Sequence, residues 1–173
     1  MGSWGKSLDT LIAGNERFVS DECNAYRSYE EQRRRLLEQG QQPIAIIVST
    51  SDAYMPPELV FDADIGDLFV LRTPELTVDR ESMDAIEFAA QKLQVPLCMI
   101  LMHDAREGDP EPDEGFWERF RREDDDEDHD AMKAAVQRVR NSSALRELMD
   151  IGEFFVVGAK YDLASGRVSV FDF

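Results

Sequence analysis

The sequence has little cysteine: two residues, Cys23 and Cys98, in a chain of 173. They lie far apart, and nothing marks a disulfide-rich secreted protein, so we expect two thiols rather than a disulfide bond. Cys98 lies in the apolar run Pro96–Leu101, where a thiol usually serves as a small buried hydrophobic group. The sequence therefore predicts a place for Cys98 in the core rather than a chemical role.

Positive charge is also scarce. Lysine and arginine number 19 against 36 for aspartate and glutamate, and the formal net charge is −17 at pH 7. A protein that recognises nucleic acid through its phosphates needs a basic face, so we expect no nucleic-acid partner. The acidity is typical of a soluble acidic domain, and a protein of a high-salt cytoplasm is the other interpretation.

Long apolar runs are missing as well. No stretch of about 18 apolar residues occurs, so we expect no membrane-spanning segment and no membrane partner. The segment Met1–Lys6 lacks the apolar region of a secretory signal, so a cytoplasmic location is the default expectation.

The residues that are present suffice for one folded domain, which we expect to span residues 1–173. An acidic insert at about residues 107–130 interrupts this domain and contains a block of like charge at 124–128. Such a block is usually solvated or disordered. Calcium binding is the sharper alternative, but the spaced loop with a central glycine that an EF-hand requires is missing.

The chain is organised around the stretch Pro43–Thr73. Its run Ile44–Val48 is continuously apolar and rich in β-branched residues, as in a strand that is covered on both faces of a parallel sheet. The polar residues Ser49–Asp52 follow at the strand's carboxyl end, where ligands bind in open α/β sheets. The proline pair Pro56–Pro57 then begins a short helix, and Leu68–Leu71 forms a second strand.

Hydrophobic spacing predicts the remaining elements. Helices are expected at Ser7–Phe18, with Ser7 as a cap, and at Tyr26–Gln39, Ser82–Leu93, Ala131–Val139 and Ala144–Met149. Strands are expected at Val95–Met102 and Phe154–Ala159, followed by a hairpin turn at 161–168 and a final strand. This order predicts an α/β fold: a central, mostly parallel sheet of about four to five strands, flanked by helices.

Several of these segments resemble the signatures of one family, the β-class carbonic anhydrases. The matching residues include Gly14-Asn15-Glu16-Arg17-Phe18, Thr50-Ser51-Asp52-Ala53-Tyr54, Pro56-Pro57-Glu58, Gly66-Asp67-Leu68-Phe69, Arg72 and the segment 161–168. The resemblance covers nearly the whole chain except the acidic insert, and it implies the family's α/β fold. It also implies that the N-terminal helix extends to a partner subunit, and hence a homodimer or a higher oligomer.

The resemblance implies a degenerate zinc site. The family's two zinc-binding cysteines correspond to Thr50 and Arg106, and its zinc-binding histidine corresponds to His103. Threonine is a poor zinc ligand beside a thiolate, and arginine stays protonated and cannot bind a metal. We therefore expect zinc to be absent and no other cofactor. A zinc site rebuilt from His103, Asp52 and Asp104 is the alternative.

The pocket around these positions is also expected to differ from the family's. Tyr54 corresponds to the arginine that pairs with the motif aspartate, here Asp52, and Glu75 corresponds to a glycine. We expect Arg106 to turn into the former metal position and pair with Asp52, because an unpaired buried carboxylate is costly. Bicarbonate or another small anion could then bind beside Arg106 and His103.

Two classes of function follow. The first is a carbonic-anhydrase-like pseudoenzyme, without CO2 hydration activity, that acts as a structural or regulatory subunit; an active relative is a candidate partner. The second is an enzyme, either a carbonate dehydratase or another hydrolase, with a rebuilt or metal-free site. There Thr50, His103 and Asp52 would form a nucleophile arrangement. The joint loss of both thiolates and of the aspartate–arginine pair favours the first class.

Overall fold

The structure is a computed structural model. It describes residues 2–23, 28–74, 76–104 and 125–172, with side chains from 129 onward in the last of these ranges. Glu75, Arg106 and most of the acidic insert lie outside the described residues, so the predictions that concern them are not tested here.

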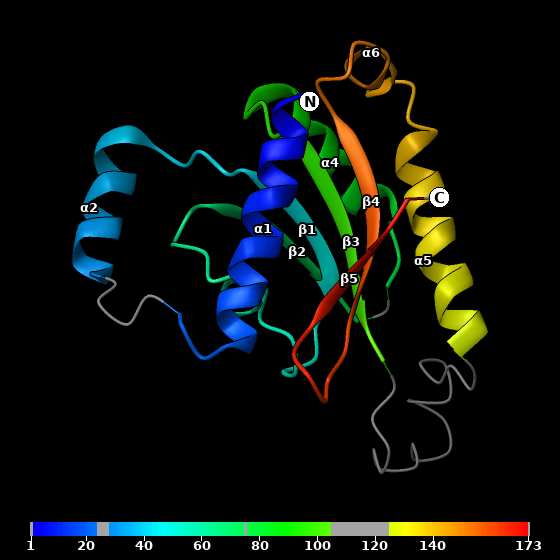
Figure 1. Cartoon of the computed structure of the whole chain (residues 1–173). Helices are drawn as coiled ribbons and strands as arrows, with labels where there is room; N and C mark the ends of the chain where they lie inside the picture. The colour runs from blue at the N-terminus through cyan, green and yellow to red at the C-terminus, as the bar shows by residue number, and fades with distance from the viewer. Residues whose placement is uncertain (1, 24–27, 75, 105–124, 173) are drawn as a thin grey trace.

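A five-stranded sheet forms the centre of the fold, with strand order β2-β1-β3-β4-β5 (Figure 1). The strands are β1 (Ala45–Thr50), β2 (Leu68–Thr73), β3 (Leu97–His103), β4 (Phe155–Tyr161) and β5 (Val168–Phe171). The first four are parallel to one another, and β5 pairs with β4 in the antiparallel direction. The predicted α/β fold with a mostly parallel sheet is therefore confirmed.

Helices cover both faces of the sheet, whereas α2 stands to one side of it (Figure 1). The helices of the described residues are α1 (Ser3–Val19), α2 (Tyr29–Gln39), α3 (Pro57–Val60), α4 (Arg80–Lys92), α5 (Asp125–Arg140) and α6 (Arg146–Asp150). Within β1, Ile46 and Val48 pack in the core cluster that contains residues of α4 and α5, whereas Ala45 and Ile47 pack in the one that contains residues of α1 and α3. Both faces of β1 are therefore buried, which explains its unbroken apolar run.

The N-terminal helix begins earlier than expected, at Ser3 rather than at Ser7. The ring of Trp4 in its first turn stacks on that of Phe155, with the centroids 4.3 Å apart. The helix packs on the sheet and on α3 of its own chain, and its expected extension to a partner subunit stays a prediction. Gly14 makes the close approach to the end of α3 possible, since a Cβ there would lie 1.9 Å from the main-chain oxygen of Phe61.

The helix α5 also begins earlier than predicted. Residues 125–128, expected to be solvated or disordered, form its first turn. Acidic residues are favourable at the N-terminus of a helix because they complement its dipole, so this part of the block is compatible with helix. In the part of the chain that the structure describes, no helix is both long and apolar enough to cross a membrane.

Burial of Cys98 agrees with the sequence. The side chain is fully buried in the core, and burial raises the pKa of its thiol to about 12. A thiol with so high a pKa is a poor nucleophile and metal ligand at neutral pH.

Candidate functional site

A polar cluster lies at the carboxyl end of the sheet. Thr50 is the last residue of β1 and His103 the last of β3, and these two strands are parallel neighbours. Their carboxyl ends therefore meet at the same edge of the sheet. Asp52 follows two residues after Thr50 and completes the cluster.

The carboxylate of Asp52 is the centre of this cluster. Its Oδ2 accepts hydrogen bonds from the Thr50 hydroxyl and from Nε2 of His103, the latter at 3.0 Å, and its Oδ1 accepts one from the main-chain N–H of Tyr54 at 3.2 Å. Partial burial alone would raise the pKa of Asp52, but the hydrogen bonds from His103 and Thr50 together with the charge of His103 hold it well below its ordinary value. Asp52 is therefore an ionised and fully engaged carboxylate.

The imidazole of His103 is held at both nitrogens. Nε2 lies 3.0 Å from Oδ2 of Asp52, and Nδ1 lies 2.7 Å from the main-chain oxygen of Asp104. The hydrogen bond to Asp52 raises the pKa of His103, the carbonyl of Asp104 acts in the same direction, and burial opposes both. A carbonyl and an ionised carboxylate can only accept, so this geometry suits the doubly protonated imidazolium, the form that the raised pKa of His103 favours.

Arg72 holds the loop that carries Asp52. Its Nε donates to the main-chain oxygen of Thr50 at 3.0 Å, and its Nη2 donates to the main-chain oxygen of Asp52. The Tyr54 ring meets the His103 ring edge to face, with the centroids 5.9 Å apart. From the sequence, Arg72 was noted as matching the family's signature, but no role in the site was assigned to it.

The structure thus brings together Thr50, Asp52, Tyr54 and His103. The nucleophile arrangement that we considered is corrected in its order: Thr50 donates to Asp52 rather than to His103, so the histidine is not placed to accept the hydroxyl proton. The predicted pairing of Asp52 with Arg106 stays a prediction, because Arg106 lies outside the described residues.

These residues do not fit a zinc ion. Oδ1 of Asp104 accepts the main-chain N–H of Leu163 at 2.9 Å, so this oxygen bonds to the β4–β5 turn rather than to Asp52 or His103. Across ranges 2–23, 28–74, 76–104 and 125–172, no three histidine, cysteine, aspartate or glutamate side chains are grouped as a metal site requires. Zinc needs about three protein ligands, whereas the described cluster offers Asp52 and His103, which bond to one another.

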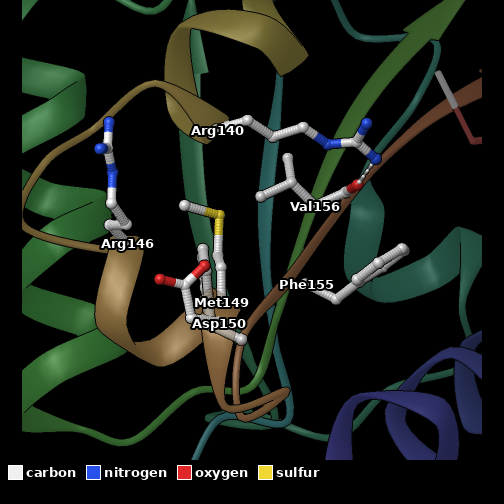
Figure 2. Close-up of a pocket in the computed structure, with 7 residues that line it drawn as sticks. Arg140, Arg146, Met149, Asp150, Phe155 and Val156 are labelled. Carbon is white, nitrogen blue, oxygen red and sulfur yellow. Dashed lines mark hydrogen bonds between the residues drawn. The ribbon is translucent and has the colours of Figure 1, made fainter.

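A groove of about 560 Å³ lies at the opposite, amino end of the sheet (Figure 2). Among its lining residues are Arg140, Arg146 and Phe155. Arg140 turns away toward the main-chain oxygen of Val156, to which it donates at 2.7 Å, and it also pairs with Asp172 at 2.7 Å. Its guanidinium is therefore committed to the fold, and the polar cluster at the carboxyl end remains the candidate site.

Comparisons with known proteins connect this geometry to one family. The family model described as carbonic anhydrase matches residues 45–108, a range that contains Thr50, Asp52 and His103. A carbonic anhydrase of Mycolicibacterium smegmatis is 30% identical over 187 residues, covering 92% of this chain and 89% of that protein. Carbonic anhydrase 2 of Mycobacterium tuberculosis is 29% identical, covering 94% and 90%.

Solved structures agree on the fold. The β-carbonic anhydrase CcaA superimposes with a TM-score of 0.62 at 19% identity, covering 95% of each chain. Tetrameric β-carbonic anhydrases from Sordaria macrospora give a TM-score of 0.64 at 17% identity, covering 97% of this chain and 98% of theirs.

Proposed function

We propose that an internal ion pair replaces the zinc site in this chain. The chain belongs to the carbonic anhydrase family and has the fold of its β class, and the proposal starts from that fact. In this proposal the protein does not hydrate CO2. It acts as a structural or regulatory subunit of an oligomer, or as a binder of small anions.

The observation that carries the proposal is the engagement of both His103 nitrogens. Nε2 donates to Asp52 and Nδ1 donates to the main-chain oxygen of Asp104. To bind a metal, the imidazole would have to lose a proton and break one of these bonds. The imidazolium and the Asp52 carboxylate already neutralise one another, so the cluster is stable without a dication.

The residues at the two positions where the family has zinc-binding cysteines support the same proposal. By family resemblance, Thr50 and Arg106 replace the two thiolates, and neither side chain supplies the negative charge that favours Zn²⁺. Zinc in this family would generate a nucleophilic hydroxide near neutral pH. None of the described residues of the cluster supplies a substitute for that hydroxide.

The proposed role as a subunit follows from the fold rather than from the site. Structures with this fold include tetrameric β-carbonic anhydrases. A chain that keeps the scaffold but not the chemistry could still assemble, as a homodimer or higher oligomer or together with an active relative. We place this assembly in the cytoplasm.

An active enzyme is the competing proposal, because the curated relatives are named carbonic anhydrases. It requires either zinc bound at a rearranged His103 or a metal-free nucleophile at Thr50. The second route is disfavoured, since the hydroxyl of Thr50 donates to a carboxylate whose pKa is lowered, and such a carboxylate is a weak base.

Metal analysis of the purified protein, combined with a stopped-flow assay of CO2 hydration, tests the proposal. We expect zinc far below one ion per chain and a rate equal to that of buffer. The M. smegmatis carbonic anhydrase, prepared in the same way, is the positive control. Zinc near one ion per chain together with measurable hydration would overturn the proposal.

A double variant sharpens the same test. Thr50→Cys with Arg106→Cys returns two thiolates to the positions that the resemblance assigns to ligands. We expect this variant to take up zinc from the same medium, which would show that the scaffold still admits the ion and that these two residues exclude it.

A further inference from the structure

We propose that Asn15 on the N-terminal helix is a positioning residue for His103, and that it acts through the turn between β4 and β5. The inference rests on the proposed function, in which His103 belongs to an internal ion pair, and it identifies what holds the histidine in that pair.

The first link joins α1 to the β4–β5 turn. Asn15 is 4% exposed, and both polar atoms of its side chain make hydrogen bonds. Its Nδ2 donates to the main-chain oxygens of Gly166 at 2.8 Å and Val60 at 3.2 Å, and its Oδ1 accepts from the N–H of Val168 at 2.9 Å. Figure 1 shows this turn beside the C-terminal part of α1. A buried amide that makes three such bonds fixes the turn against the helix.

The second link is the stiffness of the turn itself. Gly166 has a φ of +72°, a conformation that favours glycine. The N–H of Gly166 donates to the main-chain oxygen of Asp162 at 2.8 Å. The N–H of Asp162 donates to the main-chain oxygen of Arg167 at 2.9 Å. The side chain of Asp162 also accepts from the N–H of Ser165 at 2.6 Å. A displacement at 166–168 is therefore transmitted to the start of the turn.

The third link joins the turn to the histidine. The N–H of Leu163 donates to Oδ1 of Asp104 at 2.9 Å, and the N–H of Asp104 donates to the main-chain oxygen of Tyr161 at 3.3 Å. The main-chain oxygen of the same Asp104 accepts from Nδ1 of His103 at 2.7 Å. Asp104 is thus oriented by the turn on one side and orients the imidazole on the other.

Gln32 provides a matched control. It is also a buried amide, 5% exposed, on another N-terminal helix, α2. It donates to Asp64 at 3.1 Å and accepts from the N–H of Ile65 at 2.9 Å, so it holds α2 to the loop before β2. Within the described ranges, neither of these two hydrogen bonds leads to the β4–β5 turn or to His103.

The experiment compares Asn15→Ala with Gln32→Ala in the full-length chain. It measures amide exchange at Leu163 and the ring N–H signals of His103 by NMR. In Asn15→Ala we expect the Leu163 amide and the His103 Nδ1–H to exchange about tenfold faster or more than in the native chain, because local opening becomes easier. In Gln32→Ala we expect both to be unchanged, although overall stability falls.

A second pair of variants tests the last link with α1 intact. Asp104→Ala removes the acceptor for Leu163 and should reproduce the effect on the Nδ1–H signal. Asp104→Asn keeps an oxygen acceptor and should restore the native signal. This pair remains informative if Asn15→Ala fails to fold.

The outcomes separate the two proposals. Two protected ring N–H signals in the native chain, unchanged in Asn15→Ala or in Asp104→Ala, would overturn the positioning role. Absence of one ring N–H signal in a native chain that contains zinc would overturn the proposed function instead. Equal acceleration in Gln32→Ala would also overturn the positioning role, since it would reflect general destabilisation.

Discussion

The two ends of the central sheet are held together by different forces. At the amino end, Trp4 stacks on Phe155, and the Arg140 guanidinium lies 5.7 Å from the centroid of the same ring. At the carboxyl end, Asp52 and His103 form an ion pair that is partly exposed, with side-chain exposures of 27% and 17%. An aromatic stack beside the Arg140–Asp172 pair thus secures one end, whereas the Asp52–His103 pair and its hydrogen bonds secure the other. The comparison teaches that the carboxyl end, where the family's signatures lie, is the end whose stability should depend on pH and salt.

The largest expected effect is at the amino end. Trp4→Ala removes the aromatic stack between α1 and β4, and we expect it to lower the free energy of unfolding by about 3 kcal/mol. Urea denaturation measures this loss. Tyr29→Ala is the control, because Tyr29 is 61% exposed and should change stability by less than about 0.5 kcal/mol. If Trp4→Ala lost no more stability than the control, the aromatic stack would not stabilise the amino end.

A smaller effect is expected at the carboxyl end. Asp52→Asn leaves the imidazolium without its counter-charge, and because the pair is partly exposed we expect a loss of about 1–2 kcal/mol at pH 6. A double-mutant cycle with His103→Gln isolates the energy of the pair. Additive losses in the two single variants would show that Asp52 and His103 do not interact.

The dependence on pH should differ between the two ends. The pKa of His103 is raised above its ordinary value of 6.5, so its contribution is complete below that value and disappears as the pH rises through the raised pKa. The pKa of Asp52 is lowered from its ordinary value of 3.8, so its contribution is complete above that value and disappears as the pH falls toward the lowered pKa.

The native chain should therefore be more stable than the double variant Asp52→Asn/His103→Gln, and the difference in the free energy of unfolding should be largest between pH 3.8 and pH 6.5, the ordinary pKa values of the two groups. Urea denaturation across pH 3 to 9 measures that margin, whereas the margin between the native chain and Trp4→Ala should stay level. A margin for the double variant that does not change with pH would contradict the ion pair.

The smallest expected effect concerns two neighbouring hydroxyls. Within the described part of the chain, the Ser49 hydroxyl is fully buried and has no hydrogen-bond partner, whereas the Thr50 hydroxyl donates to Asp52. We expect Ser49→Ala to be neutral or to stabilise by up to about 1 kcal/mol, and Thr50→Val to destabilise by about 1 kcal/mol. Thermal unfolding of both variants checks the opposite signs.

The fold could be predicted because its signals are local. The apolar run of β1, the proline-initiated α3 and the order of strands and helices are each readable over a few residues. The start of α1 was missed; its first turn contains Trp4, which meets Phe155 about 150 residues further along the chain, and such a contact is not readable from local propensity. The helix propensity of the residues near Ser7 is a local property and does not reflect that contact.

The sequence predicted which residues belong to the candidate site but not which hydrogen bonds they form. Thr50, Asp52 and His103 could be grouped because the resemblance assigns them to one family site, and the structure places them at the carboxyl ends of two adjacent parallel strands. Which of them donates to which depends on side-chain torsions and on the Asp104 main chain, and neither leaves a pattern in the sequence. For the same reason, the clamp that Arg72 places on the loop was missed.

The contacts of Asn15 and Trp4 also have a consequence for the order of folding. Asn15 bonds to Gly166 and Val168, and Trp4 stacks on Phe155, so these contacts join segments about 150 residues apart. The same helix also contacts α3 and β1, which lie much closer to it in the sequence. Because a long loop costs more entropy to close, we expect the contacts with α3 and β1 to form first and those with β4 and its turn to form last.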